Sequence, residues 1–82
     1  GAVGLLQVEP STFQDVVREG QFGPKAAKAS GLTPADLTNI RKMTLPLTVK
    51  NKETLTKYLE TPEVNYMAAT AKIFQYLKEH NL

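Results

Sequence analysis

The chain lacks residues on which several classes of protein depend. It contains no cysteine and no tryptophan, and His80 is its only histidine. Without cysteine there is no disulfide framework and no thiolate metal site, which favours an intracellular protein whose core is held by packing alone. No apolar run approaches the roughly 20 residues that span a bilayer, and no basic-then-apolar signal segment opens the chain. The sequence therefore predicts a soluble protein without a membrane partner.

Groups typical of catalytic sites are also scarce. The acidic residues are scattered, without paired carboxylates or metal-ligand spacing, and no glycine-rich loop has the pattern of a phosphate cradle. His80 falls in a C-terminal turn that is expected to fray. Tyr58, Tyr66 and Tyr76 fall on or near apolar helix faces, where packing is the expected role. We therefore expect no enzyme activity, no cofactor, no metal and no small-molecule substrate.

The size and composition predict one domain over residues 1–82. A chain of 82 residues holds one hydrophobic core, and 41% apolar with 22% charged residues is typical of a globular fold. No internal repeat or second domain boundary is present. Because the chain begins with Gly1 and not Met, residues 1–4 are interpreted as a cleavage remnant or as a cut inside a longer protein, and no function is predicted for them. Residues 1–9 are expected to form an extended arm.

Local capping signals mark the first two helices. Ser11 is a hydroxyl N-cap with Gln14 three residues later, as in a capping box, and Gly20 suits a left-handed C-terminal position. These signals predict a helix from about Thr12 to Glu19. Pro24 at a first helical position then predicts a second, shorter helix from Pro24 to Ser30, which ends before Gly31.

The third helix has the strongest start signal. Thr33 is a good N-cap, Pro34 suits the first helical position, and Asp36 two residues later favours the positive end of the helix dipole. We predict a helix from about Pro34 to Lys42. Leu37 and Ile40 lie three residues apart and are expected to face inward, which leaves the rest of the helix surface polar.

The last third of the chain predicts a connection and two more helices. Residues 43–49 alternate between apolar and polar, but Pro46 excludes a central strand, so the segment is a linker on the core or an edge strand pairing with residues 3–8. We prefer the linker. A fourth helix should start near Asn51, and a fifth should run from Pro62 to about Glu79. Six residues of the fifth helix are expected to face inward: Val64, Met67, Ala68, Ala71, Phe74 and Leu77.

The predicted fold is thus all-α, a compact five-helix bundle with a central helix-turn-helix at about residues 24–42. Two short helices joined by a glycine-containing turn form the unit that places a recognition helix in the major groove of DNA. Ala27 is small where the two helices should cross, and Gly31 can adopt the left-handed turn conformation. Leu32, Leu37 and Ile40 supply the apolar contacts of the second helix.

The charge of the chain is concentrated in its middle. The net charge is only +2, but residues 25–57 hold seven lysines and arginines against two acids, a net charge of +5. The remaining residues hold three basic against six acidic side chains, a net charge of −3. A clustered basic surface is typical of a phosphate-binding protein, although a solvated helix face gives the same count.

The segment from Lys25 to Ile40, KAAKASGLTPADLTNI, resembles the helix-turn-helix of the lambda repressor and Cro-like family. The layout resembles that family over about residues 12–60, with Lys52 to Leu59 similar to its fourth helix. The chain departs from the pattern at Pro34, where the family often has a base-reading polar residue, and at Met43, where it usually has glycine.

The resemblance implies a set of DNA-binding residues. Ala35, Thr38 and Asn39 are expected to approach base edges, because Asn pairs with adenine and Ala or a Thr methyl group contacts thymine. Phosphate contacts are expected from the hydroxyl and basic residues of the same motif: Lys25, Lys28, Thr33, Arg41 and Lys42. Double-stranded DNA is the expected partner, and a homodimer or a larger parent protein is implied because one unit reads only a half-site.

A second function remains open at this stage. The domain could be a helical protein-interaction or assembly module without DNA binding, in which the fifth helix or the Met43–Val49 segment supplies an apolar surface. An exposed apolar patch without a coherent basic face would favour this alternative. The sequence leaves undetermined the DNA site, the choice between activation and repression, and the oligomeric state.

Overall fold

A computed structural model describes all 82 residues, and it is an all-α fold without β-strands, as the sequence predicts. Five helices follow one another along the chain: α1 (Pro10–Arg18), α2 (Pro24–Ala29), α3 (Pro34–Lys42), α4 (Val49–Leu59) and α5 (Pro62–Glu79). The predicted bounds of α3 and α5 are confirmed, and those predicted for α1, α2 and α4 differ by one or two residues.

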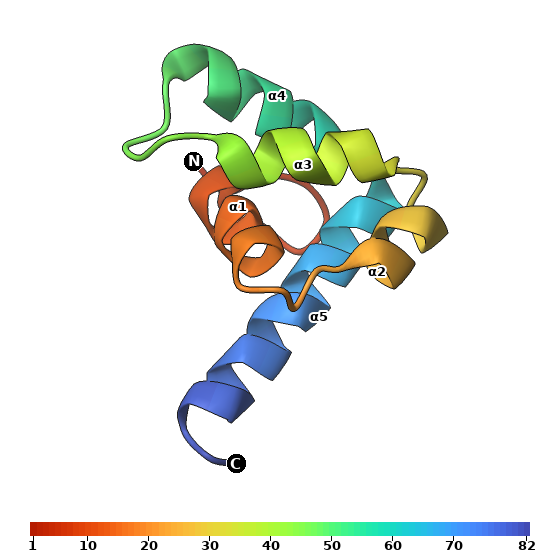
Figure 1. Ribbon diagram of the computed structural model, residues 1–82, viewed down its shortest axis with the longest axis vertical. Coiled ribbons are helices and arrows are strands. Elements are labelled where there is room, and N and C mark those ends of the chain that lie inside the picture. The colour runs from red at the N-terminus through yellow and green to blue at the C-terminus, as the bar shows by residue number, and fades with distance from the viewer.

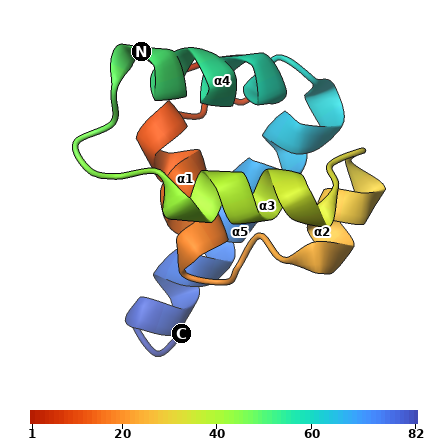
Figure 2. The same cartoon turned by 45° about the horizontal axis from the view of Figure 1, so that its top comes forward.

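Helix α1 lies at the centre of the bundle. It packs against α3, α4 and α5, while the short α2 packs against α3 and α5. Figure 2 shows α3 crossing the front of the molecule with α1 behind it. Phe13 of α1 meets Phe22 edge-to-face, with ring centroids 5.1 Å apart, and both rings are fully buried. This aromatic pair closes the core beneath the connection from α1 to α2.

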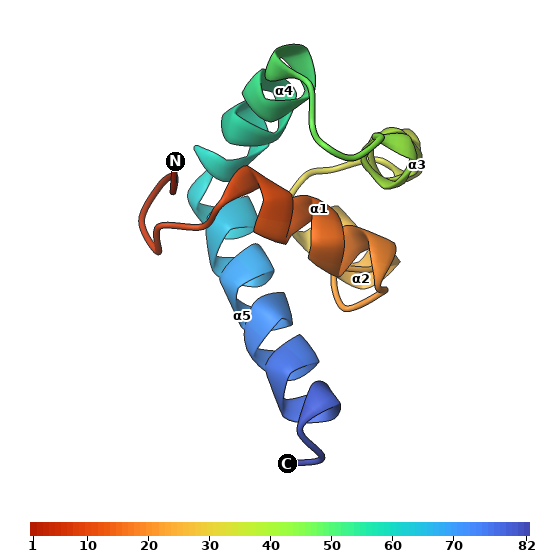
Figure 3. The same ribbon diagram turned by 90° about the vertical axis from the view of Figure 1, so that its left-hand side faces the viewer.

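Helix α5 is the longest element, and its C-terminal turns extend beyond the other helices (Figures 1 and 3). Of the side chains predicted to face inward, Val64, Ala68 and Ala71 are buried, but Phe74 is 60% exposed. The inward position predicted for Phe74 is wrong, because α1 covers the side of α5 that carries Ala71 and Gln75, whereas Phe74 only borders the groove beside α2. The packing role expected for Tyr66 and Tyr76 is also wrong, because both are exposed.

The start of α1 differs from the prediction. The helix begins at Pro10 with Glu9 as its N-cap, and no side chain caps it, so the capping box predicted at Ser11 is wrong. Proline at a first helical position needs no amide partner, and this permits the earlier start. The Gln14 side chain is buried and donates from Nε2 to the carbonyl oxygen of Met43 at 3.1 Å. That bond ties α1 to the end of α3.

The first nine residues do not form an extended arm. Val3 and Val8 pair as an antiparallel bridge that closes a tight turn, and Val8 is buried in the core. Asn65 of α5 holds this turn through two hydrogen bonds, since its Oδ1 accepts from Leu6 N at 2.7 Å and its Nδ2 donates to Val3 O at 2.7 Å. Its Nδ2 also donates to Leu59 O at the end of α4, at 2.9 Å. The turn is therefore part of the folded domain.

Gly4 has a structural role within that turn. Its φ is +74°, and a Cβ there would collide with the Asn65 side chain and lie 2.6 Å from Leu59 O. Only glycine fits this position without displacement of α5 or of the turn.

Residues 43–48 form a linker, as preferred from the sequence. Met43 and Leu47 pack against the core, whereas Leu45 is 54% exposed. Helix α4 starts at Val49, two residues earlier than predicted, because the Thr48 hydroxyl caps it by accepting from Asn51 N at 3.1 Å. No helix is both long enough and apolar enough to cross a bilayer.

Candidate nucleic-acid interface

Helix α3 has one buried and one exposed face. Leu37 and Ile40 are buried in the core, as predicted. At 100° per residue, the opposite face carries four exposed side chains: Ala35, Thr38, Asn39 and Lys42. The structure therefore brings four of the eight predicted DNA-binding residues onto one exposed face, which we call the α3 outer face. Arg41 is also exposed, but it lies nearer to the side of Leu37.

The turn before α3 has the predicted glycine geometry. Gly31 has a φ of +82°, and the amide of Leu32 donates to Ala27 O at 2.8 Å, which ends α2. Leu32 and Ala27 are buried, as expected for residues between neighbouring helices. The Ser30 hydroxyl donates back to Ala26 O. Helices α2 and α3 are thus joined by a short, fully bonded connection.

The N-terminus of α3 is closed by a reciprocal capping box. The Thr33 hydroxyl accepts from Asp36 N at 3.1 Å, and Asp36 Oδ2 accepts from Thr33 N at 2.8 Å. The Thr33 hydroxyl only accepts in this cap, so its O–H remains available, and the predicted phosphate contact of Thr33 would have to form beside the Asp36 carboxylate.

A negative charge is fixed at the same end of α3. The backbone hydrogen bond from Thr33 and a 2.9 Å hydrogen bond from Tyr58 Oη lower the pKa of Asp36. Burial, together with the charge of Asp36, raises the pKa of Tyr58. At neutral pH, Asp36 is therefore a carboxylate and Tyr58 a neutral donor. A DNA phosphate is disfavoured at this end of the helix.

The positive charge lies at the opposite end. Arg41 and Lys42 occupy the last turn of α3, both are exposed, and neither forms an ion pair. The only ion pair of the protein joins Arg18 and Asp15 within α1, at 3.2 Å. The C-terminal end of α3 therefore presents two cations whose charge no carboxylate neutralises.

Lys50 extends this positive region and was missing from the predicted site. It is exposed in the first turn of α4, and α4 begins on the side of the molecule where α3 ends (Figures 1 and 2). No acidic residue occurs between Leu37 and Lys52. The excess of basic charge in residues 25–57 was the signal that could have included Lys50.

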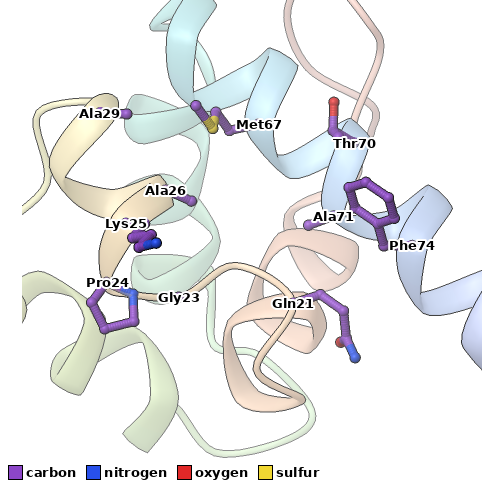
Figure 4. Close-up of a pocket in the computed structure, with 10 residues that line it drawn as sticks. All are labelled: Gln21, Gly23, Pro24, Lys25, Ala26, Ala29, Met67, Thr70, Ala71 and Phe74. Carbon is purple, nitrogen blue, oxygen red and sulfur yellow. The ribbon is translucent and has the colours of Figure 1, made fainter.

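The two lysines of α2 are exposed but separate. Lys25 borders a groove of about 570 Å³ between α2 and α5. Figure 4 shows this groove with Met67 and Phe74 from α5 and Ala26 from α2 among its lining residues. Lys28 does not line the groove. Lys25 therefore borders the groove between α2 and α5 and is not part of the α3 outer face.

The polar side chains of the α3 outer face differ in their availability. Thr38 Oγ1 donates to Pro34 O at 3.1 Å, so its hydroxyl proton is used within the helix and its methyl group is the free part. The side chain of Asn39 makes no hydrogen bond within the chain. Its amide is therefore free to donate and to accept, which is what bidentate pairing with a base edge requires.

The remaining titratable groups do not gather. His80 is exposed just after α5, where its ring stacks on Tyr76 with centroids 4.1 Å apart. No group of three or more His, Asp or Glu side chains is close enough to hold a metal ion.

Comparison with protein-family models, with curated proteins and with solved structures finds no match for this chain. The resemblance of residues 25–40 to the lambda repressor and Cro-like helix-turn-helix rests on those residues alone.

Proposed function

We propose that the domain binds double-stranded DNA through the α3 outer face. The observation that carries the proposal is that Lys42 is exposed and unpaired one helical turn from the free amide of Asn39, with Arg41 exposed and unpaired in the same last turn of α3. Unpaired cations next to an uncommitted polar side chain are what a DNA-binding helix needs for phosphate and base contacts.

The charge distribution orients α3 on the duplex. Asp36 repels phosphates at the N-terminal end, and Arg41 and Lys42 attract them at the C-terminal end. Lys50 adds a third cation at that end. The strongest backbone contacts are therefore expected around the end of α3 and the start of α4, and Lys25 and Lys28 contribute less.

Base readout is limited in this proposal. Of the three side chains expected at base edges, Asn39 is the one that can pair bidentately, while Ala35 and the Thr38 methyl group supply apolar contacts to thymine. Most of the affinity comes from phosphates, so binding should be tight only at low salt.

A titration of fluorescent mixed-sequence duplex with the purified domain, at about 50 and 200 mM salt, tests the proposal by anisotropy. Three phosphate contacts predict that log K falls with log salt with a slope of roughly −0.9 per contact, or about −3. Saturable binding with this slope supports the proposal. The absence of binding at the lower salt concentration overturns it.

A second function is favoured by a different surface. Between residues 64 and 77 the only charged residue of α5 is Lys72, and four large apolar or aromatic side chains of that stretch are more than half exposed: Tyr66, Ile73, Phe74 and Tyr76. Exposed apolar surfaces of this kind mark protein-interaction sites. The alternative of a helical interaction module therefore rests mainly on α5, because in the segment 43–49 only Leu45 and Val49 are exposed while Met43 and Leu47 pack on the core.

A further inference from the structure

We infer that two copies of this chain pair through the exposed side of α5, with the two α5 helices antiparallel. The inference concerns a surface separate from the α3 outer face and does not depend on DNA binding. It rests on the spacing, the chemistry and the exposure of the α5 side chains that point away from the core.

The outward side of α5 carries a heptad-like seam. At 100° per residue, the side opposite Val64, Ala68 and Ala71 holds four residues spaced by 4, 3 and 4 positions: Tyr66, Thr70, Ile73 and Leu77. We call these four residues the α5 seam. Tyr66 and Ile73 are each 60% exposed, and Thr70 and Leu77 are half-buried. A seam of this spacing is what a second helix packs against.

The flanks of the seam are also free of charge. Met67 and Phe74 lie on one side and Ala69 and Tyr76 on the other. Lys72 lies beyond Ala69 and Tyr76, where it donates to Gln75 Oε1 at 2.9 Å and, with Glu9, borders the groove that includes Ile73. An exposed helix normally has a charged outer face, so an uncharged one indicates that it is covered.

The spacing of the seam identifies the occupant as a second copy. In a two-fold symmetric interface each contact occurs twice, so the surface must be complementary to itself. The 4-3-4 spacing of the seam is the same whether α5 is followed from its N-terminus or from its C-terminus. An antiparallel pair therefore places Tyr66 against Leu77 of the second copy and Thr70 against Ile73 of the second copy, without any gap in the register.

The charges at the ends of the seam favour the antiparallel direction. The same register brings Glu63, one heptad before Thr70, opposite His80 of the second copy, one heptad after Ile73. Both side chains are exposed. Glu63 then faces no carboxylate, whereas a parallel pair would place Glu63 against Glu63, two like charges.

Two grooves beside the seam add to the surface that a second copy could bury. One groove lies between α2 and α5 and includes Met67 and Phe74 (Figure 4), and the other is lined by Leu6, Ala69 and Ile73. Specific interfaces bury about 1,200 to 2,000 Å² in total, more than a short helix seam provides. The flanking side chains of the second copy would occupy these grooves.

Sedimentation equilibrium of the full 82-residue chain, from about 10 μM to 1 mM, tests the inference, because this range detects dimers with dissociation constants from about 10⁻⁵ to 10⁻³ M. We expect a monomer–dimer equilibrium. Ile73→Glu should weaken it by about a hundredfold or more, since it buries a charge in each half of the seam. Val49→Glu is the matched control, because Val49 is 75% exposed at the start of α4 and lies outside the seam. Circular dichroism checks that each variant is folded.

Thr70→Leu provides a test in the opposite direction. It replaces the one polar residue of the seam, whose hydroxyl donates to Tyr66 O at 2.9 Å, and should tighten the dimer by about tenfold. A chain that stays monomeric at the highest concentration, with and without Thr70→Leu, overturns the inference. So does a dimer that Ile73→Glu and Val49→Glu leave equally intact, which would place the interface elsewhere.

Disulfide trapping tests the register, because the chain has no other cysteine. Thr70→Cys and Ile73→Cys are oxidised separately and as an equal mixture, and the cross-linked products are identified by mass spectrometry. The antiparallel register predicts a mixed disulfide between the two variants and little cross-linking of either variant alone. Cross-linking mainly within each variant would show a parallel pair and would overturn the inferred register.

Discussion

Tyr58 of α4 donates a hydrogen bond from Oη to Asp36 Oδ1 of α3 at 2.9 Å. The two residues lie 22 positions apart in the sequence. The bond joins the start of the candidate DNA-binding helix to the helix that follows it, and it holds the Asp36 carboxylate beside the capping box. The same interaction fixes the orientation of α3 and the negative charge at its N-terminal end.

Removing the Tyr58 hydroxyl should weaken the fold in a pH-dependent way. Tyr58→Phe is expected to lower the free energy of unfolding at pH 7 by about 0.5–1.5 kcal/mol, the net value of one hydrogen bond. The pKa of Asp36 is lowered in the fold, so the stability it contributes is present above the ordinary Asp pKa of about 3.9 and is lost as pH falls through the lower folded value. The difference between Tyr58→Phe and the parent should therefore shrink below about pH 4. Thermal melts from pH 2.5 to 7 measure it.

Tyr66→Phe is the matched control for that experiment. Tyr66 is 60% exposed and its hydroxyl has no partner in the chain, so its removal should change stability by less than about 0.5 kcal/mol. Equal effects of the two substitutions, or a Tyr58→Phe effect that does not change with pH, would contradict the role assigned to the Tyr58–Asp36 bond.

The turn before α3 should depend on glycine at position 31. Gly31 has a φ of +82°, and a Cβ there would have no atom within 4 Å, so any cost of Gly31→Val is backbone strain and not a clash. We expect a loss of about 1–3 kcal/mol in urea unfolding. Ala29→Val adds a similar side chain at an exposed helical position and should cost only about 0.5 kcal/mol. An unchanged stability of Gly31→Val would show that the turn does not adopt this conformation.

The parts of the fold that depend on neighbouring residues could be predicted from the sequence. The bounds of α3 follow from Thr33, Pro34 and Asp36, whose capping geometry is entirely local. The exposure of Thr38 and Asn39 follows from the helical period once Leu37 is placed inward.

The parts that depend on distant residues could not be predicted. The N-terminal turn is held by Asn65, and no local pattern in residues 1–9 indicates that contact. The helical period shows which residues of α5 share a side, but it does not show whether another helix covers Phe74. The Tyr58 bond to Asp36 is also tertiary, so the negative charge at one end of the candidate site became evident only in the fold.

The N-terminal turn should stabilise the whole domain through Asn65. Asn65→Leu removes three hydrogen bonds and leaves the buried carbonyl oxygen of Leu59 without this partner, so we expect a loss of about 2–3 kcal/mol in urea unfolding. Gln7→Ala is the control, because Gln7 bonds only to Gly4 O from an exposed position and should change stability by less than about 0.5 kcal/mol. A loss no larger for Asn65→Leu than for Gln7→Ala would show that the turn is not docked on α5.

The α3 outer face should separate base readout from phosphate attraction. Asn39 is exposed and makes no hydrogen bond within the chain, so Asn39→Ala should change stability by less than about 0.5 kcal/mol yet weaken binding at a preferred DNA site by roughly 1–3 kcal/mol. Lys42→Ala should weaken all duplexes about equally and reduce the salt slope by about one, because it removes one phosphate contact. Anisotropy titrations of a selected duplex and a scrambled duplex measure both effects. If each variant binds both duplexes as tightly as the parent chain, α3 is not the DNA-binding helix, and the interaction surface of α5 becomes the better account of the function.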